Sequence, residues 1–209
     1  NDTGMAAYIK GNSDLIGHGT AICGILTQEN AVELTVFKAF DSLDEISEEL
    51  FISILDYLCH NEHFDILNLS LGISAVSRYN RLEQVCKKIS FNGTLIVVSF
   101  NNFGTVTYPA AFPFVLGVDW DIECKRNNDF IYCENGIVDV YGKGINQKLC
   151  WSNTSDYIIS AGASFATAHI TSHLIPLLEN DEVKTYANAK ILLKKQAIKK
   201  ISMYQTPDK

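Results

Sequence analysis

Residues 94–100 read TLIVVSF, a run in which apolar side chains follow one another almost without a break. Such a run is typical of a short strand that other elements cover on both faces, as happens in a parallel sheet. It is far shorter than the roughly 20 apolar residues that a helix needs to span a bilayer. The sequence therefore predicts a buried strand at this point and no membrane insertion.

Strand and helix patterns alternate on both sides of this run. Helices are predicted at residues 18–30, 44–60, 78–91, 163–178 and 181–200, and further strands at residues 32–40, 64–71, 114–120, 130–133 and 137–141. Alternating strands and helices with short connections predict an α/β fold, in which helices flank a parallel β-sheet on both faces. The 209 residues contain no repeat, low-complexity tract or linker, so we expect residues 1–209 to form a single domain.

Composition and charge narrow the class of partner. The chain is 47% hydrophobic and 20% charged, which is ordinary for a globular protein and excludes disordered or collagen-like sequence. Its net charge of −7 argues against nucleic acid or an anionic membrane surface as the main partner. Acids gather at residues 41–49 and lysines at residues 184–200. Helix-dipole effects account for both clusters, and a docking patch for a charged partner is the alternative.

The six cysteines form no C-x-x-C pair, which leaves a zinc ribbon or a thioredoxin-like site unsupported. Cys124, Cys133 and Cys150 lie in a turn-rich region where one disulfide is allowed. The scattered pattern favours a reducing compartment, so we expect a cytoplasmic protein, with secretion after loss of a pro-segment as the alternative. Because the chain begins at Asn1 rather than Met, we also expect it to start inside a longer product.

The most informative segment is residues 161–171 (AGASFATAHIT), where small residues and Ser164 open a helical pattern. A hydroxyl at a helix N-terminus lies near free N–H groups and the positive end of the helix dipole, and both stabilise a developing oxyanion. The pattern makes Ser164 a candidate nucleophile. The alternative is that Ser164 is only an N-cap, the commonest role for a serine before a helix.

Three more candidates lie elsewhere in the chain. His18, framed by glycines in residues 17–26 (GHGTAICGIL), can present its imidazole in a cleft. This segment is not a dinucleotide-binding loop, because Ile22 stands where G-x-G-x-x-G needs a glycine. Asp2 is the acid of D-T-G at residues 2–4, and Asn102 in residues 99–104 (SFNNFG) offers an amide donor for an oxyanion.

The order acid, histidine, serine, with an asparagine between the last two, resembles that of the subtilisin-like serine peptidases. The matching sequences are DTG at residues 2–4, HGT at 18–20, NLSLG at 68–72, NNFG at 101–104, YPAAFPFVLGV at 108–118 and GASFATAH at 162–169. The resemblance covers essentially the whole chain. An α/β-hydrolase would need the serine first, then an acid and a histidine, but His169 and His173 both precede Asp181 and share one predicted helix.

The resemblance implies a role for each catalytic candidate. Ser164 would be the nucleophile, His18 the general base, and Asp2 the acid that orients His18. Asn102 would complete the oxyanion hole, together with the backbone N–H of Ser164. Asp14 is the other acid near His18, but its position matches a substrate-side position better than the triad acid, so we prefer Asp2.

The same resemblance implies the substrate site and the fold. Ser70, Leu71 and Gly72 would form the edge that pairs with an extended peptide, and Thr107 would lie at the floor of the primary pocket. The implied architecture is a subtilisin-like three-layer sandwich, shortened at its start because only Asn1 precedes Asp2. A preceding segment or a partner chain would supply the missing first strand.

Several positions depart from the family pattern. Ala163 and Phe165 replace the usual threonine and methionine, and Ala168 replaces a proline. His169 matches a structural histidine, so we expect no metal at His169 and His173. Calcium is common in the family, but no acidic cluster here has convincing ligand spacing, and we expect no cofactor.

These observations predict a serine endopeptidase that acts on a peptide or protein substrate through an acyl-enzyme, as a dedicated peptide- or precursor-processing protease. The alternative function is a catalytically weak module of the same fold that binds peptides or acts as a scaffold. The Ser, His, Asp and Asn set favours the enzyme.

Overall fold

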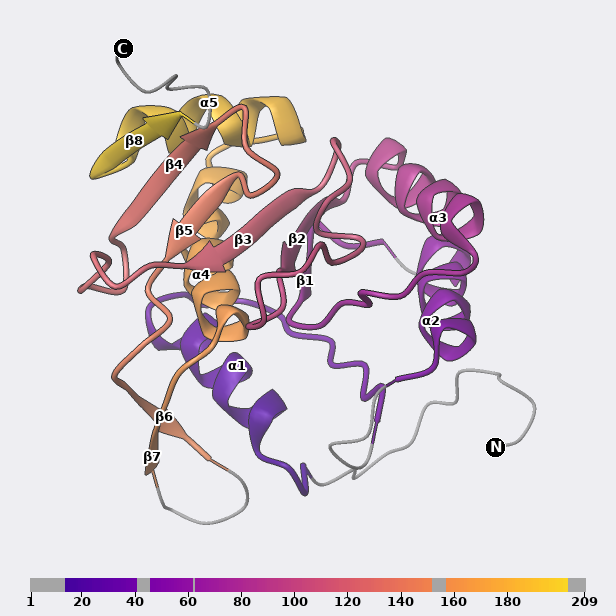
Figure 1. Cartoon of the computed structure of the whole chain (residues 1–209), viewed down its shortest axis with the longest axis horizontal. Helices are drawn as coiled ribbons and strands as arrows, with labels where there is room; N and C mark the ends of the chain where they lie inside the picture. The colour runs from indigo at the N-terminus through magenta and orange to yellow at the C-terminus, as the bar shows by residue number, and fades with distance from the viewer. Residues whose placement is uncertain (1–13, 41–45, 62, 152–156, 203–209) are drawn as a thin grey trace.

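The computed structural model describes residues 14–40, 46–61, 63–151 and 157–202. Figure 1 shows a central sheet with helices on both sides. The sheet has six strands in the order β1-β2-β3-β5-β4-β8. Their bounds are β1 Ile66–Leu69, β2 Leu95–Ser99, β3 Leu116–Trp120, β4 Phe130–Glu134, β5 Val140–Gly142 and β8 Lys199–Ser202.

The helices are α1 His18–Gln28, α2 Glu48–Asn61, α3 Tyr79–Phe91, α4 Ala163–Glu179 and α5 Tyr186–Gln196. Strands β1, β2, β3 and β5 run parallel, whereas β4 is antiparallel to β5 and parallel to β8. This arrangement confirms the predicted α/β class and its mainly parallel sheet.

The side chains of β2 alternate between the two faces of the sheet, and this explains why helices cover both faces. All five residues of β2 are buried. Ile96 and Val98 belong to the core formed with α2 and α3, whereas Leu95 and Val97 belong to the core formed with α4 and α5. Because successive side chains of a strand point to opposite faces, an almost wholly apolar strand needs apolar cover on both sides.

A third core cluster lies outside the sheet. Ala21, Ile22 and Ile25 of α1 pack with Phe165 and Ala168 of α4 and with the two-stranded hairpin that the sequence analysis missed. The hairpin consists of β6 Gln147–Cys150 and β7 Tyr157–Ser160. Through this cluster α1 is fixed to α4 rather than to the sheet.

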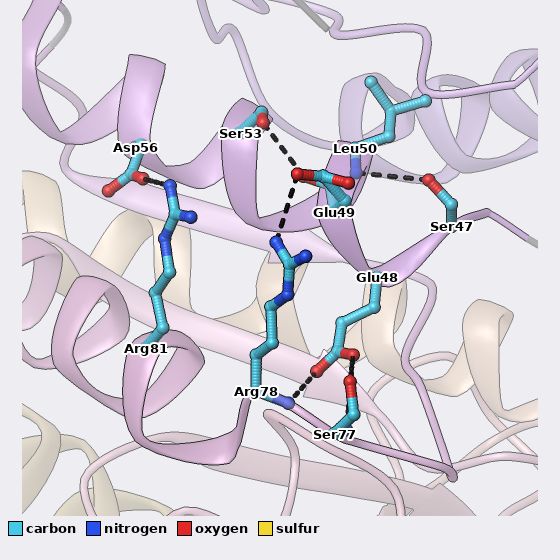
Figure 2. A network of polar contacts seen from close by, with 9 residues as sticks. All are labelled: Ser47, Glu48, Glu49, Leu50, Ser53, Asp56, Ser77, Arg78 and Arg81. Carbon is cyan, nitrogen blue, oxygen red and sulfur yellow. Dashed lines mark hydrogen bonds and ion pairs between the residues drawn. The ribbon is translucent and has the colours of Figure 1, made fainter.

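Glu48 and Glu49, at the start of α2, face α3 (Figure 2), whereas the other acids of the cluster, Asp41, Asp44 and Glu45, lie outside the described residues. The Glu48 carboxylate accepts hydrogen bonds from the backbone N–H groups of Ser77 and Arg78, at 3.2 and 2.7 Å, and from the Ser77 hydroxyl. Arg78 pairs with Glu49 at 3.1 Å and Arg81 with Asp56 at 3.0 Å. Glu48 therefore accepts from the backbone N–H groups of the two residues that directly precede α3, and this fixes the start of α3 against α2.

Two predicted elements are wrong. Residues 32–40 form no strand, and Phe37 instead packs against Tyr57 and Phe64. The predicted helix at residues 181–200 begins only at Tyr186, because the Thr185 hydroxyl caps it by accepting from the N–H of Asn188 at 3.2 Å. It ends at Gln196, and Lys199–Ser202 joins the sheet beside β4.

Two further sequence expectations concern cysteines and membranes. All six cysteines are free thiols, with Cys124 and Cys133 buried and Cys150 exposed, so the disulfide that the sequence allowed is not present. In the part of the chain that the structure describes, no helix combines the length and apolar character needed to cross a bilayer.

Candidate active site

Ser164 is the second residue of α4, and Gly162 occupies the N-cap position, so the interpretation of Ser164 as a simple N-cap is wrong. Its hydroxyl donates to the backbone carbonyl of Ser70 at 3.1 Å. In return, the Ser70 hydroxyl donates to the carbonyl of Ser164 at 3.1 Å. The structure thus places the candidate nucleophile directly against the segment predicted to bind substrate.

Asn102 reaches the same helix end from the turn after β2. Its side-chain carbonyl accepts the backbone N–H of Ala163 at 2.9 Å. This bond occupies the oxygen of the amide and leaves its NH₂ group to donate elsewhere. The first turn of α4 therefore combines the backbone N–H of Ser164, the helix dipole and an oriented side-chain donor, which are the kinds of group that stabilise an oxyanion.

Thr107 and Gly72 meet where the pocket floor was predicted. Thr107 is buried, and a Cβ atom built on Gly72 would lie 2.3 Å from the Thr107 methyl carbon. The Thr107 hydroxyl accepts from the N–H of Asn101 at 3.2 Å and donates to the carbonyl of Thr105 at 3.1 Å. Backbone hydrogen bonds between Ile73 and Tyr108 join the two segments next to this contact.

His18 is the first residue of α1 and follows Gly17, which has a φ of +88°. Its ring lies 5.9 Å, between centroids, from the ring of Phe165 in α4. Burial lowers the pKa of His18 below its ordinary value, and the charge of Asp14 opposes this effect only in part. The neutral imidazole that a general base requires is therefore favoured.

The Asp14 side chain binds the start of the helix that carries His18. Its carboxylate accepts from the backbone N–H groups of Ile16, Gly17 and Thr20 and from the Thr20 hydroxyl, at 2.7 to 3.2 Å. Partial burial raises the pKa of Asp14, but these hydrogen bonds outweigh it and the net pKa is lowered. Asp14 is thus a cap for α1.

The histidine–serine contact is not made in this structure. Among the described residues, no hydrogen bond joins His18 to Ser164, whose hydroxyl is held by Ser70. Asp2 lies outside the described residues. The structure therefore brings together Ser70, Gly72, Asn102, Thr107 and Ser164, with His18 adjoining them through Phe165.

His169 and His173 each bond to a different glutamine. The Nε2 of His169 lies 2.6 Å from the Gln147 side-chain oxygen, and that of His173 lies 2.7 Å from the Gln196 oxygen. Burial lowers the pKa of His169 to about 4. Across the described segments, no three His, Cys, Asp or Glu side chains gather in a way that would hold a metal ion.

Two polar residues that adjoin the site, Asn68 and Thr171, were not predicted from the sequence. Asn68 of β1 donates to the Ser70 hydroxyl at 3.0 Å and accepts from the Thr171 hydroxyl of α4 at 2.9 Å. A polar side chain inside a predicted apolar strand was the available signal, because a part-buried amide needs partners.

Comparison with known proteins agrees with this geometry. Residues 2–207 match the Peptidase S8 family, described as the subtilase family. The comparison with curated proteins gave no significant match. Similar solved structures include a cold-adapted subtilisin-like serine proteinase, at 22% identity and a TM-score of 0.69, over 88% of this chain and 68% of that one.

Two further solved structures share the fold. Sphericase matches at 18% identity and a TM-score of 0.70, over 91% of this chain and 73% of its own. The prenylagaramide maturation protease PagA matches at 21% identity and a TM-score of 0.62, over 87% of this chain and 73% of its own.

Proposed function

The chain belongs to the subtilase family and is a serine peptidase, and from this premise we propose that it is an endopeptidase that forms an acyl-enzyme at Ser164. One observation carries the proposal. Ser70, Asn102 and Ser164, which are far apart in the sequence, meet at the N-terminus of α4 through hydrogen bonds of 2.9 to 3.1 Å. They bring together a serine hydroxyl, the N-terminus of a helix and a side-chain amide, which supply the nucleophile and the oxyanion donors for acyl transfer.

The proposed reaction follows from these groups. The Ser164 oxygen attacks the peptide carbonyl carbon while His18 takes the hydroxyl proton, and the oxyanion is stabilised by the Ser164 N–H and the Asn102 amide. The C–N bond then breaks as His18 gives the proton to the leaving amine. Water, activated by His18, releases the acyl group and restores Ser164. In this proposal Asp2 orients His18 and stabilises its protonated form.

Substrate arrival would change the hydrogen bonds of Ser164. In the structure its hydroxyl is bound to the Ser70 carbonyl. An extended peptide that pairs with the edge at residues 70–72 would take that carbonyl for its own N–H, which frees the Ser164 hydroxyl for His18.

The test is the variant Ser164→Ala together with a fluorophosphonate label, which reacts only with an activated serine. We expect wild-type chain to hydrolyse peptides and take up one label, and the variant to do neither while keeping its unfolding transition. Labelling of the variant would contradict the assignment. A folded wild-type chain that takes up no label would favour the alternative, a peptide-binding or scaffold module.

The pocket contact supports a proposal on specificity. The Thr107 methyl group occupies the space beside Gly72, so the floor is filled. Within residues 99–108 and 70–75 no acidic residue is present to pair with a buried lysine or arginine, and an unpaired buried charge is costly. We expect small or medium uncharged side chains before the cleaved bond, as in an enzyme dedicated to one peptide or precursor.

A peptide library tests this specificity. We expect Thr107→Gly to widen acceptance towards Phe and Tyr, because it removes the methyl group that fills the floor. Wild-type preference for Arg, Lys or Phe would show that the pocket lies elsewhere.

A further inference from the structure

A continuous chain of hydrogen bonds links α4 to β1 behind the candidate nucleophile. The Thr171 hydroxyl donates to the Asn68 side-chain oxygen at 2.9 Å, and the Asn68 NH₂ group donates to the Ser70 hydroxyl at 3.0 Å. The Ser70 hydroxyl donates in turn to the backbone carbonyl of Ser164 at 3.1 Å. The chain therefore begins and ends on the same helix and passes through the strand between these points.

The setting of this chain is largely apolar. Thr171 lies two turns after Ser164 in α4 and is 1% exposed. The neighbouring positions of α4 that enter the core include Ala163, Ala166, Ala168 and Ile170, all buried. Contacts between small apolar side chains are non-directional and allow a helix to slide or rotate, whereas hydrogen bonds impose a narrow range of distance and angle.

We infer that Asn68 and Thr171 are positioning residues, which hold the backbone of Ser164 at a fixed distance from the substrate edge at residues 70–72. This inference rests on the proposed role of Ser164. When substrate takes the Ser70 carbonyl, the bond from the Ser164 hydroxyl is lost. The bond from the Ser70 hydroxyl to the Ser164 carbonyl is then the polar link that remains between these two residues, and Asn68 orients that hydroxyl. We therefore expect this hydrogen-bond chain to affect the reaction rate mainly in the substrate-bound and transition states.

Helix α4 offers a matched pair of threonine variants. Thr171→Val removes the hydroxyl that orients the Asn68 amide and nearly conserves volume. Thr167→Val makes the same change at a residue of α4 that is also buried, but the Thr167 hydroxyl donates to the carbonyl of Ala163, within its own helix, at 2.8 Å. Thr171→Ser restores the hydroxyl, and Ser70→Ala breaks the chain at its half-buried end without opening the core.

The experiment measures the rate constant of fluorophosphonate labelling, the labelled fraction at completion, and kcat and KM on a peptide. We expect Thr171→Val and Ser70→Ala to lower the labelling rate constant and kcat about 10- to 100-fold, since small misplacements of reacting groups cost rates of this size. The labelled fraction and the KM of these two variants should stay close to the wild-type values. Thr167→Val should stay within about twofold, and Thr171→Ser should recover most of the lost rate.

Each other result has a defined meaning. Equal rate constants for Thr171→Val, Thr167→Val and wild type would overturn the inference, as would a loss confined to the labelled fraction, which reports unfolding rather than misplacement. If Thr171→Val does not fold, the labelling rate constant of Ser70→Ala decides: a value equal to that of wild type overturns the inference, and a value lower by about 10- to 100-fold supports it. A folded wild-type chain without label would overturn the proposed function and the inference together, whereas a labelled wild type with unaffected variants overturns the inference alone.

Discussion

At the scale of single residues, the position of His18 depends on the glycine before it. Gly17 has a φ of +88°, in the left-handed region that side chains disfavour. A Cβ atom there would lie 2.6 Å from the indole ring of Trp151, so the ring of Trp151 occupies the space that a side chain would need. The position of His18 is therefore set by backbone conformation and by close packing together.

We expect Gly17→Ala to destabilise the fold by more than about 1 kcal/mol and to lower kcat, because both the backbone and Trp151 must shift beside His18. Gly93→Ala is the matched control, since Gly93 has a similar φ of +97° but an added Cβ would meet nothing within 4 Å. Urea unfolding and peptide hydrolysis measure the two effects. Equal losses of stability in both variants would show that Trp151 does not constrain Gly17.

Asn102 allows a sharper test of the proposed oxyanion site. We expect Asn102→Ala to lower kcat roughly 10²- to 10³-fold with little change in KM, because the amide would bond mainly to the charged intermediate. Asn102→Asp keeps an oxygen that can accept the N–H of Ala163 but replaces the donor with a negative charge. It should lose at least as much kcat, and near-normal activity in this variant would assign Asn102 only a structural role.

At the scale of elements, α5 is joined to the sheet by a buried polar group, the carboxylate of Asp139. Asp139, which directly precedes β5, is 6% exposed. Its carboxylate accepts from Lys190 at 2.6 Å, from the Tyr186 hydroxyl at 3.2 Å and from the N–H of Gly117 in β3 at 3.1 Å. Burial and the charge of Asp139 raise the pKa of Tyr186 to about 12, so its hydroxyl remains a donor.

Lys190→Met should destabilise the protein by about 2 kcal/mol, less than a fully buried pair because the Lys190 side chain is 29% exposed. The loss arises because the Asp139 charge stays buried without its cation. Lys194→Met is the control on the same helix, since Lys194 pairs with Glu134 at the surface and such pairs contribute little. Equal unfolding midpoints for the two variants would contradict this account.

Prediction from sequence succeeded for elements whose own pattern determines them. The apolar run of β2 and the amphipathic α3 agree with prediction to within one or two residues. Residues 32–40 failed because β-propensity reports fit to a half-buried sheet surface rather than a backbone preference, and no described strand pairs with them. The β6–β7 hairpin and β8 are short and partly exposed, so their patterns carry little signal.

The same distinction, between features set by a local pattern and features that depend on distant partners, applies to the candidate site. Ser164, Asn102 and Ser70, which meet in the structure, could be selected as candidates from the sequence because each sits in a distinctive local motif. The chain through Asn68 and Thr171 was not identified, because each hydrogen bond depends on a partner far away in the sequence. No local motif specifies such a pairing.

At the scale of the whole molecule, the site lies where the sheet and its covering helix meet. Ser70 follows β1, Asn102 follows the parallel neighbour β2, and α4 begins against both. Crevices at the carboxyl ends of parallel strands are the usual ligand sites of open α/β sheets. The topology thus brings separate motifs to one edge, and α4 must remain docked on the sheet for the site to exist.

His169 lies on this docked helix and makes the stability of the whole molecule depend on pH. It is 5% exposed and bonds to Gln147 of the β6–β7 hairpin. Burial, with a smaller contribution from the Lys143 charge, lowers its pKa to about 4, from an ordinary value of 6.5. Between these two pH values the unfolded chain binds a proton that the folded chain does not, so stability is lost as pH falls.

We expect the free energy of unfolding to decrease by about 3 kcal/mol between pH 6.5 and pH 4 on account of His169. His18, whose pKa is also lowered by burial, adds to the loss in the same direction. Urea unfolding across this range measures the slope for wild type and for His169→Gln, which has no group that titrates there. The variant can be less stable at every pH, but its slope should be shallower. Equal slopes would show that His169 binds its proton equally well in the folded and unfolded chains.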